Sequence, residues 1–188
     1  MAEFLAATER LILREWRTID RALFLRHLNS PAVMRWLGGV QDEASYTAAF
    51  DRLDSYQREF GHTFWIVERK SDAEVLGFCG LKRVNAEGAL NPGDFEIGWR
   101  LREDAWGQGI AKEAAIATLD LAFGRFAAPH IVALTVAGNR DSWGLMERLG
   151  MTRRADLDFE DLHSGPDLNP TIVYSITAAD WTDARVAV

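Results

Sequence analysis

The stretch FEIGWRLREDAWGQGIAKEAAIATLDLAFGRF, residues 95–126, decides how the rest of the chain is interpreted. We predict a strand over residues 95–101, a glycine-bearing loop over residues 102–109 and a long helix over residues 110–126. Apolar side chains recur in the helical part at three- and four-residue spacing, which indicates one buried helical face. The residues expected on that face are Ile116, Leu119, Phe123 and Phe126.

The junction between this loop and this helix has the properties of an anion-binding site. The first four N–H groups of a helix have no partner inside it, and the aligned peptide dipoles place about half a positive charge there. Gly107 and Gly109 lack a Cβ atom, so an anion can approach the backbone closely. The pattern predicts a phosphate cradle, although a tight strand-to-helix turn without a ligand has the same local sequence.

Composition and charge limit the classes of function. The chain has 188 residues, of which 48% are hydrophobic and 26% charged, as in a soluble globular domain. The net charge is −7 and no basic run occurs, so we expect no nucleic-acid partner. The single cysteine, Cys79, excludes an intramolecular disulfide and a cysteine-rich zinc site. The N-terminus does not have the pattern of a signal peptide, and no apolar run approaches the roughly 20 residues that span a bilayer. We therefore expect a cytoplasmic protein with no membrane partner.

The order of the remaining elements predicts a mixed α/β sheet in one domain. Helices are expected at residues 20–28, 31–37 and 42–60, and from Asn139 or Asp141 to Gly150. Further strands are expected at residues 10–16, 63–68, 75–81, 130–136, 151–154 and 171–176. A long polar segment occupies residues 156–170.

Two motifs, in this order and at this spacing, resemble those of the GCN5-related N-acetyltransferase (GNAT) superfamily. The first is WGQGIA at residues 106–111, and the second is NRDSWGLMERLGM at residues 139–151. The segments TERLILREW, residues 8–16, and EIGWRL, residues 96–101, resemble the branch that contains the ribosomal-protein alanine N-acetyltransferases. The resemblance implies one N-acetyltransferase domain over residues 8–178, with terminal extensions at 1–7 and 179–188. It also implies a mostly antiparallel central sheet, flanked by helices and splayed at its central strands.

Two positions depart from the family pattern. Trp106 stands where the phosphate loop often begins with Gln or Arg, although an aromatic residue is common in this branch. Met146 stands where many members carry a tyrosine general acid, so the thiolate must receive its proton from another group. Other phosphate loops fit less well, because the Gly-x-x-x-x-Gly-Lys pattern is absent and Lys112 replaces the third glycine of Gly-x-Gly-x-x-Gly.

The resemblance implies acetyl-CoA as the cosubstrate. Backbone N–H groups of residues 107–112 would hold its pyrophosphate, and the bulged strand at residues 99–102 would pair with its pantetheine arm. Asn139 and Ser142 would face the pantetheine and the thioester. The expected cofactor-binding residues are Trp99, Arg100, Leu101, Arg102, Trp106, Gly107, Gln108, Gly109, Ile110, Ala111, Lys112, Asn139, Ser142 and Met146.

Glu96 and Ser142 are the candidate catalytic residues. Glu96 precedes the strand segment expected beside the thioester, so its carboxylate could accept the amine proton directly or through water; a structural role in holding a backbone group or an arginine is the alternative. Ser142 could donate a proton to the thiolate, with helix capping or packing as its alternative. A backbone N–H of residues 99–101 would meet the oxyanion.

The histidines and the cysteine are weaker candidates for catalysis. His27, His62 and His130 lie near element ends, where structural or solvent-facing roles are expected, and His163 lies in the segment expected to border the acceptor site. Cys79 is expected to be a small buried side chain, which argues against a cysteine-linked intermediate.

The sequence predicts an acetyl-CoA-dependent N-acetyltransferase that acts on a primary amine by direct attack in a ternary complex. The acceptor is a protein N-terminus or a small molecule, and the chain is a monomer or a homodimer. Trp36 and Trp65 could wall the acceptor pocket, and an acidic group in residues 156–167 could attract a cationic amine; that group is Asp156, Asp158, Glu160, Asp161 and Asp167. A non-catalytic acyl-CoA-binding regulator is the alternative, and a nucleotide-binding module is a more distant one.

Overall fold

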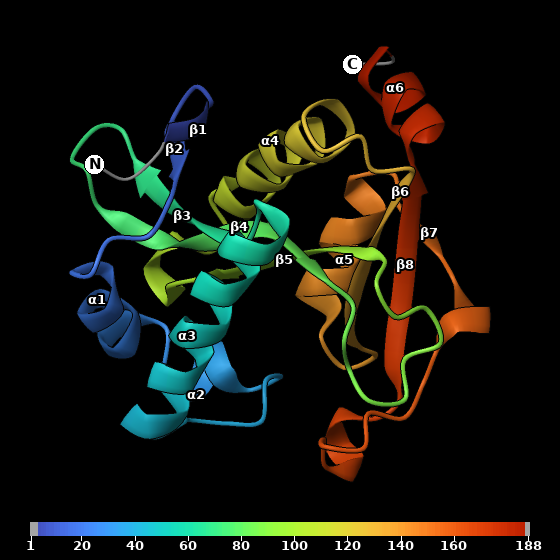
Figure 1. Cartoon of the computed structure of the whole chain (residues 1–188), viewed down its shortest axis with the longest axis horizontal. Coiled ribbons are helices and arrows are strands. Elements are labelled where there is room, and N and C mark those ends of the chain that lie inside the picture. The colour runs from blue at the N-terminus through green and yellow to red at the C-terminus, as the bar shows by residue number, and fades with distance from the viewer. Residues whose placement is uncertain (1–3, 187–188) are drawn as a thin grey trace. The chain divides into compact units, whose positions relative to one another are not determined.

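A computed structural model describes residues 4–186. Its strands are hydrogen-bonded in the order β1-β2-β3-β4-β5-β6-β8-β7 and form an open sheet. Contacts between residues divide the chain into two compact units. The first unit holds residues 1–82 and 98–118, and the second holds residues 83–97 and 119–188. Figure 1 labels their helices and strands.

The strands of the first unit pair antiparallel. Short connections join β1 to β2 and β3 to β4, whereas three helices separate β2 from β3 in the chain. Trp65 lies opposite Cys79 across the β3–β4 pair, and a register shift interrupts that pair between Val67 and Glu68. The strands that begin in this unit are β1 (Phe4–Ala7), β2 (Leu11–Arg14), β3 (Phe64–Arg69) and β4 (Val75–Arg83). The backbone N–H of Arg102 donates to the Leu76 carbonyl oxygen at 2.9 Å, which ties β5 to β4.

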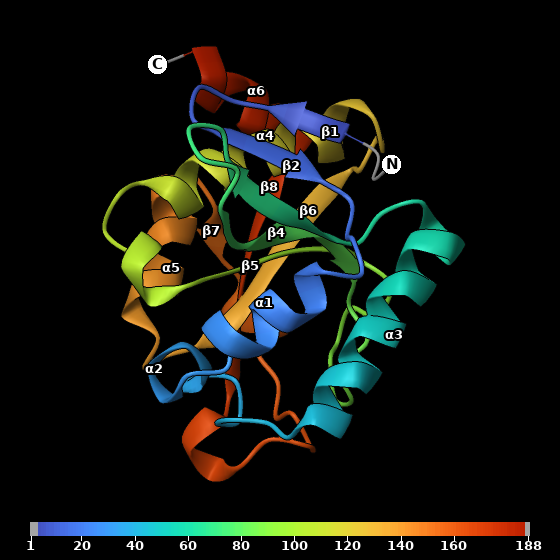
Figure 2. The ribbon, with the colours of Figure 1, turned by 90° about the vertical axis from the view of Figure 1, so that its left-hand side faces the viewer.

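Local capping signals set the helices of the first unit, as the sequence predicts. Ser30 Oγ accepts from the Val33 N–H ahead of α2, and Asp42 Oδ1 accepts from the Ser45 N–H at 2.8 Å ahead of α3. Gly61 closes α3 in the left-handed conformation, with φ +70°. The helices are α1 (Asp20–His27), α2 (Pro31–Met34) and α3 (Glu43–Phe60). Figure 2 shows α1 and α3 on the same side of β3 and β4.

Aromatic side chains dominate the core of the first unit. Phe24, Phe50 and Phe78 pack together, with Phe24 and Phe78 stacked at a centroid distance of 5.6 Å. The helical spacing of the apolar residues in α3 predicts a face made of Tyr46, Ala49, Leu53, Tyr56 and Phe60. This prediction is partly wrong, because Tyr46 is buried as expected but Phe50 belongs to the core and Phe60 is 37% exposed. The period of the face was correctly identified, but the packing of α1 over its first half decides which side chains are covered.

The predicted buried face of α4 (Ile110–Gly124) is also only partly correct. Leu119 is fully buried, whereas Ile116 and Phe123 are half-buried. The most covered positions carry small side chains, which let a helix approach its neighbours closely: Ala114, Ala115, Ala117, Thr118 and Ala122. Size rather than hydrophobicity therefore distinguishes the covered side of this helix.

The second unit contains the later strands and helices. β6 and β8 pair antiparallel over seven residues, with Ala133 opposite Tyr174, and they run side by side in Figure 1. β5 runs parallel to β6, with Glu96 opposite Val132. β5 (Phe95–Leu101) begins in this unit, but its residues from Gly98 on belong to the first unit. The other elements are β6 (His130–Val136), α5 (Arg140–Arg148), β7 (Thr152–Arg153), β8 (Thr171–Thr177) and α6 (Ala178–Val186). The core of this unit includes Val84, Val132, Phe159 and Val173.

The fold class is confirmed as α/β with an open, mostly antiparallel sheet flanked by helices. Two elements were not predicted. Residues 4–7 form β1 against β2, and residues 178–186 form α6, where the Trp181 indole donates to Asp120 Oδ1 at 2.9 Å. The polar segment at residues 156–170 includes parts of two 3₁₀ turns, Ala155–Leu157 and Pro166–Leu168. No helix in the described part of the chain is long and apolar enough to cross a membrane.

Candidate active site

The loop before α4, where the sequence predicts an anion cradle, has an open backbone. Gly107 and Gly109 have φ angles of +69° and +75°, a region that disfavours side chains. A Cβ atom at Gly107 would meet nothing within 4 Å, so the space in front of this backbone is open. Within residues 4–186, no hydrogen-bond acceptor reaches the backbone N–H groups of residues 107–112. Six successive free N–H groups at the start of a 15-residue helix fit a pyrophosphate.

Side-chain bonds hold this loop in place from its N-terminal side. The Trp106 indole N–H donates to the Leu101 carbonyl oxygen at 2.9 Å, and Gln108 Nε2 donates to the Asp104 carbonyl oxygen at 2.5 Å. Arg102 binds Asp104 at 2.6 Å and Glu74 at 2.5 Å, and its hydrogen bonds lower the pKa of Asp104. Trp106 is 47% exposed, so its ring remains available on one side.

Arg10 and Glu113 fix the other side of the loop, and the sequence did not suggest this role for either residue. Arg10 Nη1 donates to the Gln108 carbonyl oxygen at 3.0 Å, and Arg10 Nε binds Glu113 at 2.7 Å. Glu113 also accepts from the Thr8 hydroxyl and from the Arg10 backbone N–H at 2.9 Å. Their separation of 103 residues explains why no local signal revealed the pair.

The strand residues expected beside the pantetheine differ in which of their polar groups are already hydrogen-bonded. The backbone N–H of Arg102 is already bonded to Leu76, and its guanidinium is held by two carboxylates. Leu101 is buried, and its carbonyl oxygen accepts from Trp106. Trp99 and Arg100 are half-buried, and the side chain of Arg100 is directed toward Tyr46. The Arg100 carbonyl oxygen faces β4, where a Cβ atom at Gly77 would lie 2.1 Å from it. Strand alternation directs the backbone of Trp99 to the opposite edge, so Trp99 is the residue best suited to the predicted pairing.

The second unit holds the two candidate catalytic residues. Glu96 is buried, at 8% exposure, on β5. Of the two residues at which the sequence lets α5 begin, Asn139 and Asp141, Asn139 occupies the N-cap, but its side chain makes no cap hydrogen bond. Within residues 4–186, Ser142 Oγ also makes no hydrogen bond, which removes helix capping as the explanation for its hydroxyl. Met146 is 1% exposed and packs inside the unit.

The other candidates have mostly structural roles. Burial raises the pKa of the Cys79 thiol to about 12, and Cys79 Sγ accepts from Thr118 Oγ1 at 3.3 Å, so this cysteine is an inert core residue as expected. His130 binds Asp94 at 2.9 Å. His163 is 78% exposed and binds Glu87 at 2.8 Å. Trp65 is fully buried, so the expectation that it walls a pocket is wrong.

The acidic segment has less free charge than its sequence suggests. Arg154 binds Asp156 at 2.6 Å, and Arg153 Nη1 donates to Asp158 Oδ1 at 2.6 Å. Asp161 accepts from the His163 N–H at 2.9 Å, so it acts within its own loop. Two of the five carboxylates are therefore paired with arginines, which weakens the attraction of this segment for a cation.

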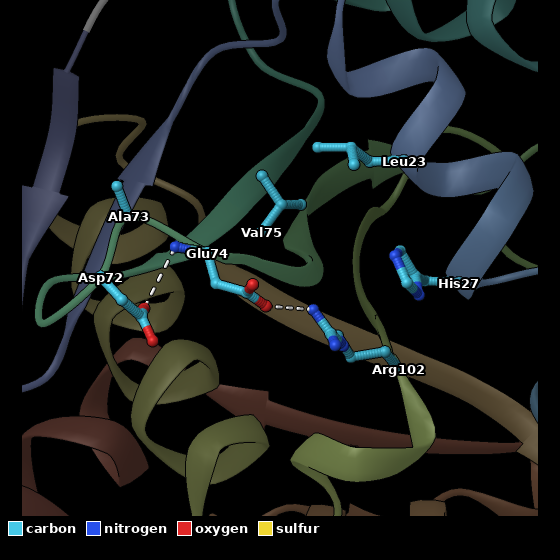
Figure 3. A pocket seen from close by; sticks show the side chains of 7 residues that line it. All are labelled: Leu23, His27, Asp72, Ala73, Glu74, Val75 and Arg102. Carbon is cyan, nitrogen blue, oxygen red and sulfur yellow. Dashed lines mark hydrogen bonds and ion pairs between the residues drawn. The ribbon is translucent and has the colours of Figure 1, made fainter.

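A cavity of about 240 Å³ lies between α1, the β3–β4 turn and Arg102 (Figure 3). Leu23 and Val75 supply its apolar walls. Its two acids are already bonded, because Asp72 binds Arg69 at 2.6 Å and Glu74 binds Arg102. The full lining is Leu23, His27, Asp72, Ala73, Glu74, Val75 and Arg102. The free N–H groups of residues 107–112 do not line this cavity, so it is distinct from the anion cradle.

Known proteins share both the sequence pattern and the fold. The family model described as "Acetyltransferase (GNAT) domain" matches residues 10–152. The uncharacterized protein YkkB of Bacillus subtilis is 33% identical over 77% of this chain and 83% of its own length. An acetyltransferase structure from Agrobacterium tumefaciens has a TM-score of 0.76 at 28% identity and covers 93% of this chain and 94% of that one.

A structure of RimL, a ribosomal L7/L12 alpha-N-protein acetyltransferase, has a TM-score of 0.77 and covers 94% of this chain and 95% of that one. At 14% identity this likeness concerns the fold alone. The GNAT family model, in contrast, spans more than half of the sequence, and it includes the cradle at residues 107–112 and the Asn139 and Ser142 motif. On this evidence the chain belongs to the GNAT acetyltransferase family.

Proposed function

We propose that this protein transfers an acetyl group from acetyl-CoA to a primary amine by direct attack in a ternary complex, in the cytoplasm. The observation that carries the proposal is the row of six unbonded N–H groups at residues 107–112. Such a row, together with the positive end of the helix dipole, suits a pyrophosphate without any change of backbone. The Arg10 guanidinium, which is paired with Glu113, donates to the Gln108 carbonyl oxygen and so helps to hold the loop in this conformation.

The remaining roles follow the family pattern and the polar groups that the structure leaves unbonded. The segment at residues 99–101 would run along the pantetheine arm, with the backbone of Trp99 directed away from β4 and toward it, and a backbone N–H in this strand would meet the oxyanion. Glu96 would take the proton from the attacking amine, and Ser142 Oγ, which has no intramolecular hydrogen bond, would give one to the departing thiolate. When bound, acetyl-CoA supplies the activated acyl group; the chain aligns the reactants, which can be worth about 10⁵ M or more in effective concentration.

Cofactor binding is tested by thermal shift. Acetyl-CoA at 100 times its Kd should raise Tm by about 5 to 10 °C, whereas ATP should give a much smaller shift. Gly109→Trp should abolish the acetyl-CoA shift, because the side chain fills the cradle. Gly61→Trp is the matched control, since Gly61 has a similar φ of +70° and an open position at the end of α3, whereas a Cβ atom at Gly109 would contact only Arg10 Nη2, at 3.5 Å. Retained micromolar affinity in Gly109→Trp would refute the placement.

Turnover is tested by thiol release across a panel of amines and N-terminal peptides. Glu96→Gln should lower kcat by about 100-fold or more, the usual contribution of a general base, while acetyl-CoA affinity stays near wild type. Unchanged turnover at neutral pH would show that Glu96 is not the base. Tight cofactor binding without turnover on any amine would instead favour the non-catalytic acyl-CoA-binding regulator.

A further inference from the structure

Arg100 is a partly buried arginine without a carboxylate partner. Its Nε atom is sealed from solvent and has no hydrogen-bond acceptor. Its Nη1 donates to Tyr46 Oη at 3.4 Å, and its guanidinium carbon lies 5.3 Å from the centre of the Phe78 ring. In the described part of the chain no carboxylate reaches it. Burial lowers the pKa of Arg100, and the nearby Tyr46 offsets part of that effect.

Two other covered arginines of the first unit are each paired with two carboxylates. Arg14, 4% exposed in its side chain, binds both Asp20 and Glu68. Arg102, 17% exposed in its side chain, binds both Glu74 and Asp104. Removing a cation from water costs several kcal/mol unless an anion compensates. Arg100 is therefore an exception that needs a counter-ion from outside the chain.

Tyr46 holds the guanidinium in position. The Tyr46 hydroxyl donates to the Leu28 carbonyl oxygen at 3.0 Å, so its oxygen is free to accept from Arg100. A guanidinium carries five N–H donors. The N–H donor at Nε is buried, and one N–H of Nη1 donates to Tyr46. Three N–H donors therefore remain on the two terminal nitrogens. A carboxylate or a phosphate can bind these terminal donors end-on.

The position of Arg100 in β5 connects it with the proposed function. Its backbone belongs to the segment assigned above to the pantetheine arm, and its side chain lies on the side where Tyr46 and Phe78 pack. Gly98 shares this side of the strand, because a Cβ atom there would meet the Phe64 ring at 2.8 Å. An anion at Arg100 would thus lie over the α3 side of the strand rather than at the phosphate cradle.

We propose that Arg100, held by Tyr46, binds an anionic group of the acceptor, so that the substrate is an amine that also carries a carboxylate or a phosphate. This inference rests on the proposed function, because it names the substrate class of that reaction. It also contrasts with the cationic acceptor that the acidic segment suggested.

The test compares amines in matched pairs that differ by the anionic group. Glycine is set against glycinamide, β-alanine against β-alaninamide, and O-phosphoethanolamine against ethanolamine, with kcat/KM corrected for the free-amine concentration. Wild type should prefer the anionic member of at least one pair by about 10- to 100-fold, the usual value of a hydrogen bond to a charged group. The carboxylate and phosphate pairs distinguish the two anions.

Variants assign the preference to Arg100. Arg100→Gln should bring the ratio of kcat/KM between the anionic and the neutral amine of the preferred pair close to one. Arg100→Lys keeps the charge and should retain part of the preference for the anionic amine. Arg52→Gln, at an exposed position of α3, removes the same charge from the same unit and should leave the ratio unchanged. No preference in wild type, or an unchanged ratio in Arg100→Gln, overturns the inference. A preference for succinyl-CoA over butyryl-CoA with a neutral amine also overturns it, because the anion would then belong to the acyl group.

A binding measurement separates this inference from the proposed function. N-Acetylglycine, N-acetyl-β-alanine and O-phospho-N-acetylethanolamine are titrated against their neutral counterparts in the presence of CoA, with thermal shift as the readout. Stabilisation by an anionic member that disappears in Arg100→Gln supports the anion site even if no amine is acetylated. Equal shifts for anionic and neutral members refute the site even if acetylation is observed.

Discussion

At the residue scale, Arg14 shows how a polar side chain can organise a core. Its guanidinium lies 2.8 Å from Asp20 and 2.7 Å from Glu68, and it also donates to the Glu15 carbonyl oxygen at 2.9 Å. Asp20 in turn accepts from the Arg17 backbone N–H at 2.7 Å, just before α1 begins. Burial alone would lower the pKa of Arg14, but its hydrogen bonds to the two carboxylates raise it. One side chain therefore joins β2, β3 and the start of α1.

Arg14→Met is expected to lower the free energy of unfolding by about 3 to 5 kcal/mol, because it leaves the buried Asp20 carboxylate without its cation. For a chain of this size the corresponding loss in Tm is roughly 6 to 20 °C. Thermal and urea unfolding measure it. Arg17→Met is the control, since Arg17 is 53% exposed and 4.0 Å from Glu68, and it should change stability by less than about 0.5 kcal/mol. Equal losses in the two variants would contradict the role given to Arg14.

At the scale of elements, glycines decide how closely β4 packs. A Cβ atom at Gly80 would lie 2.3 Å from the Thr63 carbonyl oxygen, and one at Gly77 would lie 2.1 Å from the Arg100 carbonyl oxygen. Both obstacles are backbone atoms of a neighbouring strand, which cannot rotate away. β4 therefore needs glycine where β3 and β5 approach it.

Gly80→Ala is expected to destabilise the fold by about 2 kcal/mol or more, because the strands must separate to admit the methyl group. Gly124→Ala, at the end of α4, meets no atom within 4 Å and should be neutral or stabilising by up to about 1 kcal/mol. Urea unfolding of the two variants measures the difference. A Gly80→Ala protein as stable as wild type would show that β3 and β4 are more loosely paired than the structure indicates.

At the scale of the whole molecule, arginine-paired carboxylates link stability to pH. Hydrogen bonds from Arg69 lower the pKa of Asp72, and those from Arg102 lower the pKa of Asp104, but these acids are largely exposed and contribute little. Glu113 is better covered, at 18% exposure of its side chain. Burial alone would raise the pKa of Glu113, but hydrogen bonds from Thr8 and Arg10 outweigh it and lower the pKa. The folded protein therefore binds fewer protons than the unfolded chain at acid pH.

The contribution of Glu113 to stability should accordingly be constant from pH 7 to about 5 and decline below 4.5, the ordinary pKa of a glutamate, as the pH falls toward the lower pKa of Glu113 in the folded state. Glu113→Gln should lose about 1 kcal/mol at pH 7 and show a shallower acid decline, because it no longer takes up a proton. Glu43→Gln, exposed in the first turn of α3, is the control. Urea midpoints between pH 3 and 7 measure both effects, and parallel acid declines in Glu113→Gln and wild type would exclude Glu113 as a source of the slope.

Much of the fold was predictable because its signals are local. Residues 95–101 and 130–136 form strands at the predicted bounds, and Ser30, Asp42 and Gly61 act as helix ends where the sequence suggested them. The open glycine loop before α4 was predictable for the same reason, since a Gly-x-Gly loop before a helix is a short-range pattern; its role as a phosphate cradle stays a prediction. β1 was missed because it has only four residues and its register with β2 is interrupted, and α6 because its Trp181 contact with Asp120 spans 61 residues of sequence.

The sequence by itself determined the order of the strands and helices, the GNAT motifs and the glycine cradle, because backbone conformation and capping depend on neighbouring residues. Only the tertiary structure decided that Trp65 is sealed in the core, that Arg10 and Glu113 hold the phosphate loop, and that Arg100 lacks a carboxylate partner. Burial and charge pairing arise from contacts between residues that are far apart along the chain. Their energies are therefore set by packing, which a local pattern does not contain.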